Sequence, residues 1–161
     1  MWEKIKPYIK TYAVAIAIPI AVGLLSALFT KDSMDIYEEI IVPPLAPPSW
    51  LFPIAWGILY ILMGISSGLV YTKKEMSPEA ARVGLTTYAV SLVINFAWSL
   101  LFFNAGAFLL SFIWLLLLLY TIIRTIYYYR KVYNVAAYLQ IPYVLWVIFA
   151  GYLNFSIWLM N

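Results

Sequence analysis

The sequence predicts an all-α membrane protein, a five-transmembrane-helix bundle with a long proline-rich first loop. Of its 161 residues, 65% are hydrophobic and only 11% are charged. A soluble domain of this length is about half apolar and about a quarter charged. The apolar residues also fall into separate runs, each near the ~20 residues that a helix needs to cross a bilayer. We therefore expect one membrane domain that covers residues 1–161.

The first predicted span covers residues 12–29 and follows a basic segment that contains Lys4, Lys6 and Lys10. A basic start before an apolar run is also the pattern of a signal peptide. The length of the run, and the lack of an A-x-A cleavage site after it, favour a membrane span.

The first loop then ends in four prolines, Pro43, Pro44, Pro47 and Pro48. Each proline lacks an N–H and fixes its own φ, so these residues cannot lie inside a membrane helix. They predict a stiff, extended segment that leads into the second span, residues 50–71. Trp50 stands where an interfacial aromatic residue would anchor that span.

Three further spans are predicted at residues 84–102, 107–127 and 136–159. The third and fourth are separated only by a short turn around Asn104, Ala105 and Gly106. These two spans should therefore be antiparallel neighbours.

The distribution of Lys and Arg predicts the orientation. One side of a five-span chain holds Lys4, Lys6, Lys10, Lys73, Lys74, Arg82, Arg124, Arg130 and Lys131, and the other holds only Lys31. Basic residues accumulate on the cytoplasmic side, so the N-terminus is expected inside, with the C-terminus and the first loop outside. Without an organelle-targeting feature, this pattern predicts a multi-pass protein of a bacterial cytoplasmic membrane.

Composition also excludes several functions. The chain has no Cys and no His, so disulfides, thiol chemistry, zinc sites and the usual haem axial ligands from those residues are ruled out. We expect no metal site and no resident cofactor. No Asp or Glu lies well inside a span, which disfavours an ion-driven transporter. The expected partners are the lipid bilayer and a small molecule, with no nucleic acid.

Aromatic residues form stripes on three of the spans. Pro53, Trp56 and Tyr60 share a face of the second span, and Asn95, Trp98 and Phe102 share one on the third. The stripe on the fifth span consists of Pro142, Tyr143, Trp146, Phe149, Ala150, Leu153 and Asn154. For any single tryptophan, core packing or an interfacial belt is the better interpretation. Three stripes together favour a cavity for a flat apolar ligand.

Gly64 and Gly68 form a GxxxG pattern in the second span. Such a pair can serve as a dimer face, or it can let two helices of one bundle approach closely. Close packing within the bundle is the more frequent use.

Three segments, APPSWLFPIAWGILYILMG, NFAWSLLFF and PYVLWVIFAGYLNFSIW, resemble the TspO/MBR family of tryptophan-rich sensory proteins. This family is related to the mitochondrial translocator protein, or peripheral benzodiazepine receptor. The resemblance runs along essentially the whole chain. It implies a five-helix bundle, commonly a homodimer, that binds porphyrins and benzodiazepine-type ligands in a pocket beneath the first loop.

The resemblance also implies residue roles. Trp56 and Trp146 match two pocket tryptophans that are linked to light-dependent breakdown of protoporphyrin IX, and they would be the catalytic residues of that reaction. Asn95 and Trp98 match the N-x-x-W of the third span, and Ala150 matches a small pocket residue. The full set expected to contact ligand is Pro48, Trp50, Trp56, Tyr60, Asn95, Trp98, Phe102, Tyr143, Trp146, Phe149, Ala150 and Leu153.

Three positions depart from the family pattern. Leu45 stands where a loop tryptophan is common, and Gly151 replaces a slightly larger residue. Phe155 and Leu159 stand where the cholesterol-recognition pattern of animal members needs a Tyr and a basic residue, so that pattern is not supported.

The leading hypothesis is a porphyrin-binding sensor, regulator or scavenger. The alternatives are a light- and oxygen-dependent porphyrin-degrading enzyme and, third, a porphyrin or sterol translocator. The acidic first loop, with Asp32, Asp35, Glu38 and Glu39 against Lys31, would repel the two propionates of a porphyrin that faced it.

Overall fold

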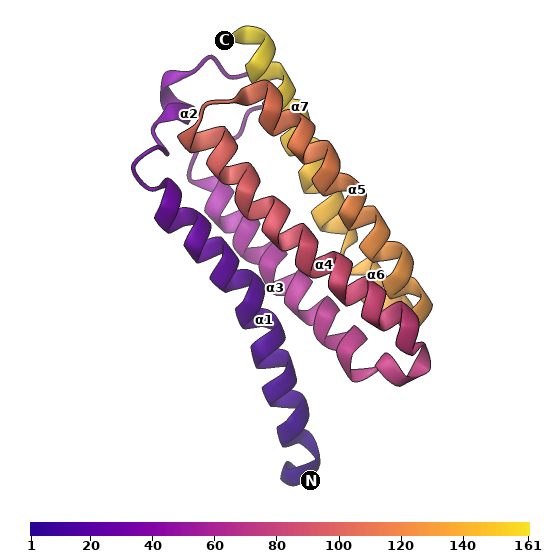
Figure 1. Cartoon of the computed structure of the whole chain (residues 1–161). Coiled ribbons are helices and arrows are strands. Elements are labelled where there is room, and N and C mark those ends of the chain that lie inside the picture. Colours follow the sequence, from indigo (N-terminus) through magenta and orange to yellow (C-terminus); the bar gives the residue numbers. More distant parts are fainter.

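The computed structural model describes residues 1–161, apart from the side chain of Trp2. Five long helices form a bundle: α1 (Trp2–Thr30), α3 (Leu51–Thr72), α4 (Pro78–Ser99), α5 (Phe108–Val132) and α7 (Ile141–Met160) (Figure 1). Each of the five, with the short helical turns that continue α4 and precede α7, is long and apolar enough to cross a membrane. The predicted all-α five-helix bundle is confirmed.

Short elements connect the long helices. They are α2 (Ile36–Glu39) in the first loop, η1 (Lys74–Met76), a π-helical turn η2 (Leu100–Asn104) that continues α4, and α6 (Asn134–Tyr138) before α7. The fifth predicted span is therefore made of α6 and α7 together. The structure places the N-terminus at one end of the bundle, and α2 and the C-terminus at the other (Figure 1).

The helices are longer than the apolar runs that predicted them. α1 begins at Trp2 rather than at residue 12, α4 begins at Pro78 rather than at residue 84, and α5 continues to Val132. Hydropathy marks only the part of a helix that matches the hydrocarbon core, whereas backbone hydrogen bonding continues through the polar ends. Pro78 also suits the first turn of a helix, because its missing N–H has no partner there.

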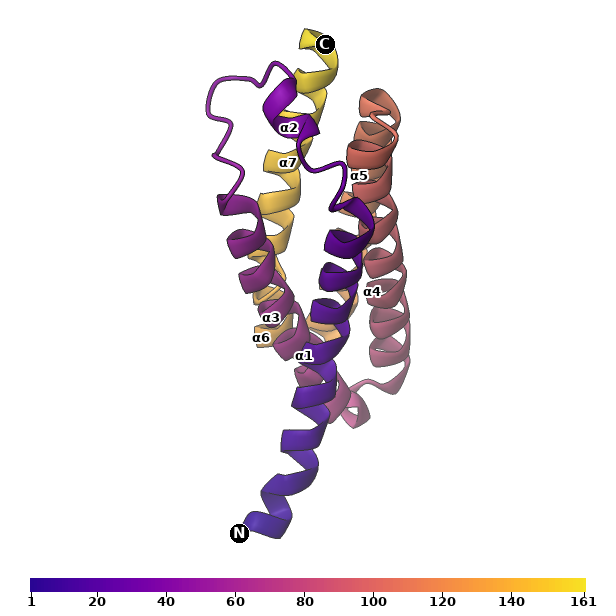
Figure 2. The same ribbon diagram turned by 90° about the vertical axis from the view of Figure 1, so that its left-hand side faces the viewer.

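The GxxxG pair packs against α1 of the same chain. A Cβ on Gly64 would collide with the backbone of Ile16, and a Cβ on Gly68 would lie 2.6 Å from the Tyr12 ring. The two glycines thus bring α1 and α3 into close contact in the half of the bundle farther from α2. Toward α2 the two helices diverge (Figure 2).

Buried and half-buried polar side chains join the other helices. Trp114 Nε1 on α5 donates to the carbonyl of Ile94 on α4 at 3.0 Å. Ser66 Oγ on α3 donates to the carbonyl of Ala136 at 2.7 Å and accepts from Gln140 Nε2 at 3.1 Å. Polar groups at membrane depth need such internal partners. As predicted, α4 and α5 pack as neighbours along their length.

Candidate functional site: an aromatic cavity beneath the first loop

A cavity of about 380 Å3 lies between α1, α3, α4 and α7, directly beneath the first loop. Its lining is mostly apolar and aromatic, and among the described residues that form it none is charged. The aromatic and amide residues of the lining are Tyr37, Phe52, Trp56, Tyr60, Asn95, Trp98, Phe102, Phe103 and Asn154.

Trp56 is the centre of the aromatic wall. Its ring stacks on Tyr60, one helical turn further along α3, with centroids 5.6 Å apart and planes 27° from parallel. The Trp98 ring of α4 lies 6.3 Å from it. Because the rings come from two helices, the wall is continuous across the α3–α4 interface.

The π-helical turn η2 shapes the α4 side of the cavity. The N–H of Ala105 bonds to the carbonyl of Leu100 at 3.0 Å, five residues back, which widens the helix at this point. Both Phe102 and Phe103 then line the cavity, although an α-helix would turn adjacent residues about 100° apart.

Asn95 is one of two buried amides of the cavity wall, with 3% of its surface exposed. Its Nδ2 donates to the hydroxyl of Tyr60 at 3.4 Å, a long hydrogen bond. An amide offers two donor hydrogens and an acceptor oxygen. Asn95 therefore retains capacity to bind a polar group of a ligand.

Asn154 fixes the orientation of Trp98. Its Oδ1 accepts from Trp98 Nε1 at 3.1 Å and from Ser111 Oγ at 2.9 Å, and its Nδ2 donates to the carbonyl of Phe108 at 2.7 Å. The amide of one α7 residue thereby joins α4, α5 and α7. With its N–H bound in this way, the Trp98 indole keeps one position in the wall.

Small residues of α1 close the remaining side. Gly23, Ser26, Ala27 and Thr30 line the cavity, and a Cβ on Gly23 would collide with the Tyr60 ring. Leu24 of α1 and Ile61 of α3 also line the cavity yet are 67% and 43% exposed. The cavity therefore reaches the lipid-facing surface between these two helices.

Residues 31–50 form a lid over the cavity. Met34 and Tyr37 of the lid belong to the lining. The Tyr37 hydroxyl donates to the carbonyl of Pro47 at 2.9 Å, which closes the lid on itself. Partial burial raises the pKa of the Tyr37 hydroxyl.

Two residues attach the lid to the bundle: Tyr152 on α7 and Asn161, which directly follows α7. The Tyr152 hydroxyl donates to the carbonyl of Pro44 at 2.8 Å. The side chain of Asn161 accepts from the N–H of Ile41 at 3.0 Å and donates to the carbonyl of Ile41 at 2.9 Å.

The predicted site residues divide into two groups. The cavity lining contains Trp56, Tyr60, Asn95, Trp98, Phe102, Ala150 and Leu153. It does not contain Pro48, Trp50, Tyr143, Trp146 and Phe149. Pro48 and Trp50 are exposed on the lid, Trp50 to 63%.

Trp146 and Tyr143 lie behind Trp56 rather than on the cavity surface. Their rings contact Trp56 edge to face, with centroids 6.4 Å and 6.1 Å away. Trp146 also contacts Phe149 at 5.7 Å. Its Nε1 is buried and has no hydrogen-bond partner. Tyr143, Trp146 and Phe149 therefore pack behind the aromatic wall of the cavity.

The α1 wall was missing from the sequence-based set, because small apolar residues have no distinctive chemistry. The feature of the sequence that could have identified these residues is their spacing. Gly23, Ala27 and Thr30 stand at i, i+4 and i+7, so small side chains share one helical face.

Comparison with known proteins shows extensive similarity. The model of the TspO/MBR family matches residues 15–159. Tryptophan-rich protein TspO of Chlorobaculum tepidum is 35% identical over 158 residues, which cover 95% of this chain and 97% of the relative. Protein CrtK of Rhodobacter capsulatus is 36% identical over 139 residues, covering 86% and 85%. The translocator protein of Homo sapiens is 34% identical over 125 residues, covering 78% and 74%.

Proposed function

The chain belongs to the TspO/MBR family, and from that premise we propose that it binds tetrapyrroles within the membrane as a sensor, regulator or scavenger. The observation that carries the proposal is the uncharged cavity whose wall is built from Trp56, Tyr60 and Trp98. Indole and phenol rings stack on flat π systems, and Asn95 can bind one polar group of the ligand.

The size of the cavity is compatible with part of a large planar ligand. At about 380 Å3 it lies in the lower part of the ~300–1,000 Å3 range of ligand pockets. Since the cavity reaches the surface between α1 and α3, a wide ring can insert one edge against Trp56 and Trp98 and extend outward toward lipid.

The test is a titration of detergent-purified protein with protoporphyrin IX in the dark, followed by tryptophan fluorescence. Ala150→Phe fills the cavity and should weaken binding at least tenfold. Ala13→Phe adds the same bulk on the lipid-facing side of α1 and should leave the Kd unchanged. The proposal fails if the wild type shows no saturable quenching, or if Ala150→Phe binds as tightly as the wild type.

A second function, photo-oxidative degradation of the bound porphyrin, is favoured by the contacts between Trp56, Trp146 and Tyr143. These side chains are oxidisable, and Trp56 connects the other two to the cavity. In this reaction, which requires light and oxygen, Trp56 would contact the porphyrin. An electron from Trp146 would pass through Trp56 to the photoexcited porphyrin and on to oxygen, so that oxygen is reduced and the Trp146 indole is left as a radical cation.

Illumination of the complex tests this second function. Trp146→Phe should leave the Kd for protoporphyrin nearly unchanged, because Trp146 does not line the cavity, and should slow the loss of the porphyrin absorption spectrum. Equal rates in the variant and the wild type would exclude Trp146 from the reaction.

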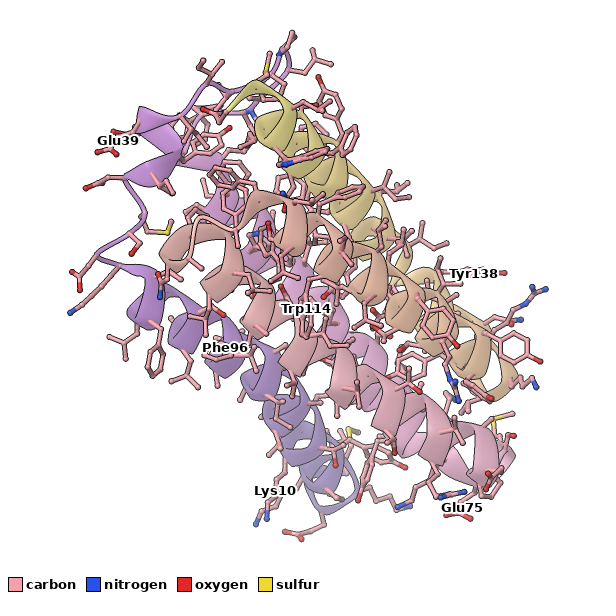
Figure 3. All side chains as sticks on the ribbon, turned by 45° about the horizontal axis from the view of Figure 1, so that its top comes forward. Lys10, Glu39, Glu75, Phe96, Trp114 and Tyr138 are labelled. Atoms are coloured by element: carbon pink, nitrogen blue, oxygen red, sulfur yellow. The ribbon has the colours of Figure 1, made fainter. Side chains whose placement is uncertain are left out.

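We also propose the topology that the charge pattern favours: a cytoplasmic membrane, with the N-terminus inside and the lid outside. Figure 3 is consistent with this topology, because Lys10 of the basic N-terminal segment lies at the end of the bundle opposite to Glu39 of the lid. A homodimer remains part of the proposal. Its interface would use a face other than Gly64 and Gly68, which α1 already covers.

A further inference from the structure

The lid consists of two chemically different halves. Its charged side chains all lie in residues 31–39, and residues 40–50 contain none. We call residues 40–50 the apolar half of the lid. Its exposed apolar side chains are Ile41, Val42, Leu45 and Trp50. A group of large apolar side chains on the surface marks a place where the protein meets another molecule or a membrane.

Leu45 is the most exposed of these side chains, at 83%. Its backbone has a φ of 70°, in the left-handed region that residues with a Cβ rarely adopt. A strained backbone of this kind persists only where the surrounding structure holds it in place. The lid therefore presents a large apolar side chain outward in spite of the backbone strain.

Hydrogen bonds at two points place the apolar half against α7. The Ile41 backbone binds the side chain of Asn161, just beyond α7, and the carbonyl of Pro44 accepts from the Tyr152 hydroxyl at 2.8 Å. Asn161 and Tyr152 are nine residues apart, which is about 13.5 Å along an α-helix. Since Tyr152 is exposed, the chain from Ile41 to Pro44 descends along the outer side of α7.

This descent brings the apolar half below the surface of the membrane. The span formed by α6 and α7 contains 27 residues, a length of about 40 Å, which matches a bilayer with its headgroup regions. Asn161 then lies at the outer edge of the headgroups, and Pro44 lies near their boundary with the acyl chains. In Figure 2 the chain between α2 and α3 loops outward from the bundle, and α3 begins below the end of α7.

The apolar half is also continuous with the lipid-facing surface of α3. Trp50 is followed at i+4, i+8 and i+11 by Ile54, Ile58 and Ile61, and all four side chains are exposed. Residues at this spacing share one face of a helix. Because α3 crosses the membrane, that face meets lipid, and Trp50 extends it into the lid. Tryptophan is the residue that favours the boundary between lipid and water.

The backbone of the apolar half suits a region where water is scarce. Four of its residues are prolines, which have no N–H. The N–H of Ile41 donates to Asn161 Oδ1 at 3.0 Å, and the N–H of Ala46 donates to the carbonyl of Pro43 at 3.2 Å. Fewer free backbone donors lower the cost of leaving bulk water.

We propose that the apolar half of the lid is a membrane-docking surface. Its four exposed apolar side chains insert between the headgroups and the acyl chains of the leaflet on the lid side, while residues 31–39 stay in water. The cover of the cavity is then held by the bundle on one side and by lipid on the other. This inference does not depend on the identity of the ligand.

The test uses an NBD dye, whose emission reports the polarity of its surroundings, on Leu45→Cys, Ile41→Cys or Asp35→Cys. The chain has no other cysteine. Asp35 is the matched control, because it is exposed on the charged half of the same lid. Ile41→Cys keeps the attachment to Asn161, since both hydrogen bonds use the Ile41 backbone.

Each labelled protein is placed in phosphatidylcholine nanodiscs at one copy per disc, so that both membrane faces are open to water. Iodide quenches dyes that lie in water. Phosphatidylcholine with a nitroxide close to the glycerol quenches dyes at the depth proposed for the apolar half, and the same lipid with the nitroxide at the end of the acyl chain quenches dyes at the centre of the bilayer.

Iodide should quench the dye at positions 41 and 45 at least about threefold less than at position 35, because lipid covers these two positions. The nitroxide close to the glycerol should quench them at least about threefold more than it quenches position 35. It should also act more strongly than the nitroxide at the chain end, because irregular backbone stays out of the centre of the bilayer.

Equal iodide quenching at the three positions in singly occupied discs would overturn the inference. If protection from iodide then arose only in discs with two copies, a second copy of the chain, and not lipid, would cover the apolar half. Neither measurement requires a tetrapyrrole, so the outcome is independent of whether the proposed function holds.

Discussion

At the scale of single residues, Asn154 shows how an amide organises an aromatic site. It is 1% exposed and binds Trp98, Ser111 and the carbonyl of Phe108. A buried donor that loses its partner retains the full cost of desolvation. The position of Trp98 in the cavity wall therefore depends on a side chain from another helix.

Replacing Asn154 with Leu should lower the free energy of unfolding by about 1–3 kcal/mol. Since about 1 kcal/mol corresponds to roughly 2–4 °C in a chain of this size, the unfolding temperature in detergent should fall by several degrees. In a Trp98→Phe background the same substitution should cost less, because one of its partners is already gone. An unchanged unfolding temperature would contradict the assigned role.

The sequence could not predict whether the Trp146 side chain lies on the cavity surface or behind it. Helical periodicity placed Trp146, Ala150 and Leu153 on one stripe of α7, and Ala150 and Leu153 do line the cavity. Trp146 lies on the same stripe but packs behind Trp56. Periodicity identifies which residues share a helical face, but the rotation of that helix against α3 depends on packing with other helices.

At the scale of elements, the contact between α1 and α3 depends on the absence of side chains at Gly64 and Gly68. Gly64→Ala forces its methyl group against the Ile16 backbone and should cost about 1–3 kcal/mol through overpacking. Gly57 lies on the same helix, and a Cβ added there would have no neighbouring atom within 4 Å. Gly57→Ala should be neutral or stabilising by up to about 1 kcal/mol.

Thermal unfolding of both variants in one detergent measures this difference, and gel filtration reports their oligomeric state. Equal stability of the two variants would contradict the close α1–α3 contact. A change of oligomeric state in Gly64→Ala without a loss of stability would instead assign the glycine pair to a dimer interface.

The lid is the second element for which the structure makes a testable prediction, which concerns the pH dependence of its docking. Burial raises the pKa of Tyr37 above its ordinary value, so the docked lid favours the neutral hydroxyl that donates to Pro47. Above a pH of about 10, the usual tyrosine pKa, the undocked lid ionises first. Docking should therefore be insensitive to pH between about 6 and 9 and weaken above a pH of about 10.

A dye on Asp32→Cys, in a chain without other cysteines, reports lid mobility by fluorescence anisotropy. The wild-type lid should become more mobile as the pH rises above about 10. Tyr37→Phe should be more mobile at neutral pH, because it lacks the hydrogen bond, and should lose the alkaline change. An identical pH profile in both proteins would refute this role of Tyr37.

At the scale of the whole molecule, the five apolar helices and the family establish a multi-pass membrane protein. The orientation can be tested with single cysteines and a membrane-impermeant maleimide. Asp35→Cys on the lid should react in intact cells, whereas Lys74→Cys should react only after lysis. The opposite pattern would invert the proposed topology.

The number and order of the helices could be predicted from the sequence, because hydropathy and proline each constrain the backbone of the segment in which they occur. Pro43 to Pro48 could not lie inside a helix, and the length of the apolar runs favoured membrane spans. The cavity was predictable only in part. Tryptophan and amide residues identify its aromatic side in the sequence. Its α1 side contains small residues such as Gly23 and Ala27, which contribute to the cavity only by leaving space.

The attachment of the lid also bears on how the protein can be handled. Both hydrogen bonds between Ile41 and Asn161 depend on the conformation of Asn161, immediately beyond α7. A purification tag or fluorescent protein attached beside Asn161 would disturb these two hydrogen bonds directly. A tag placed before α1, which extends away from the lid (Figure 1), would leave them intact and is the better choice for binding measurements.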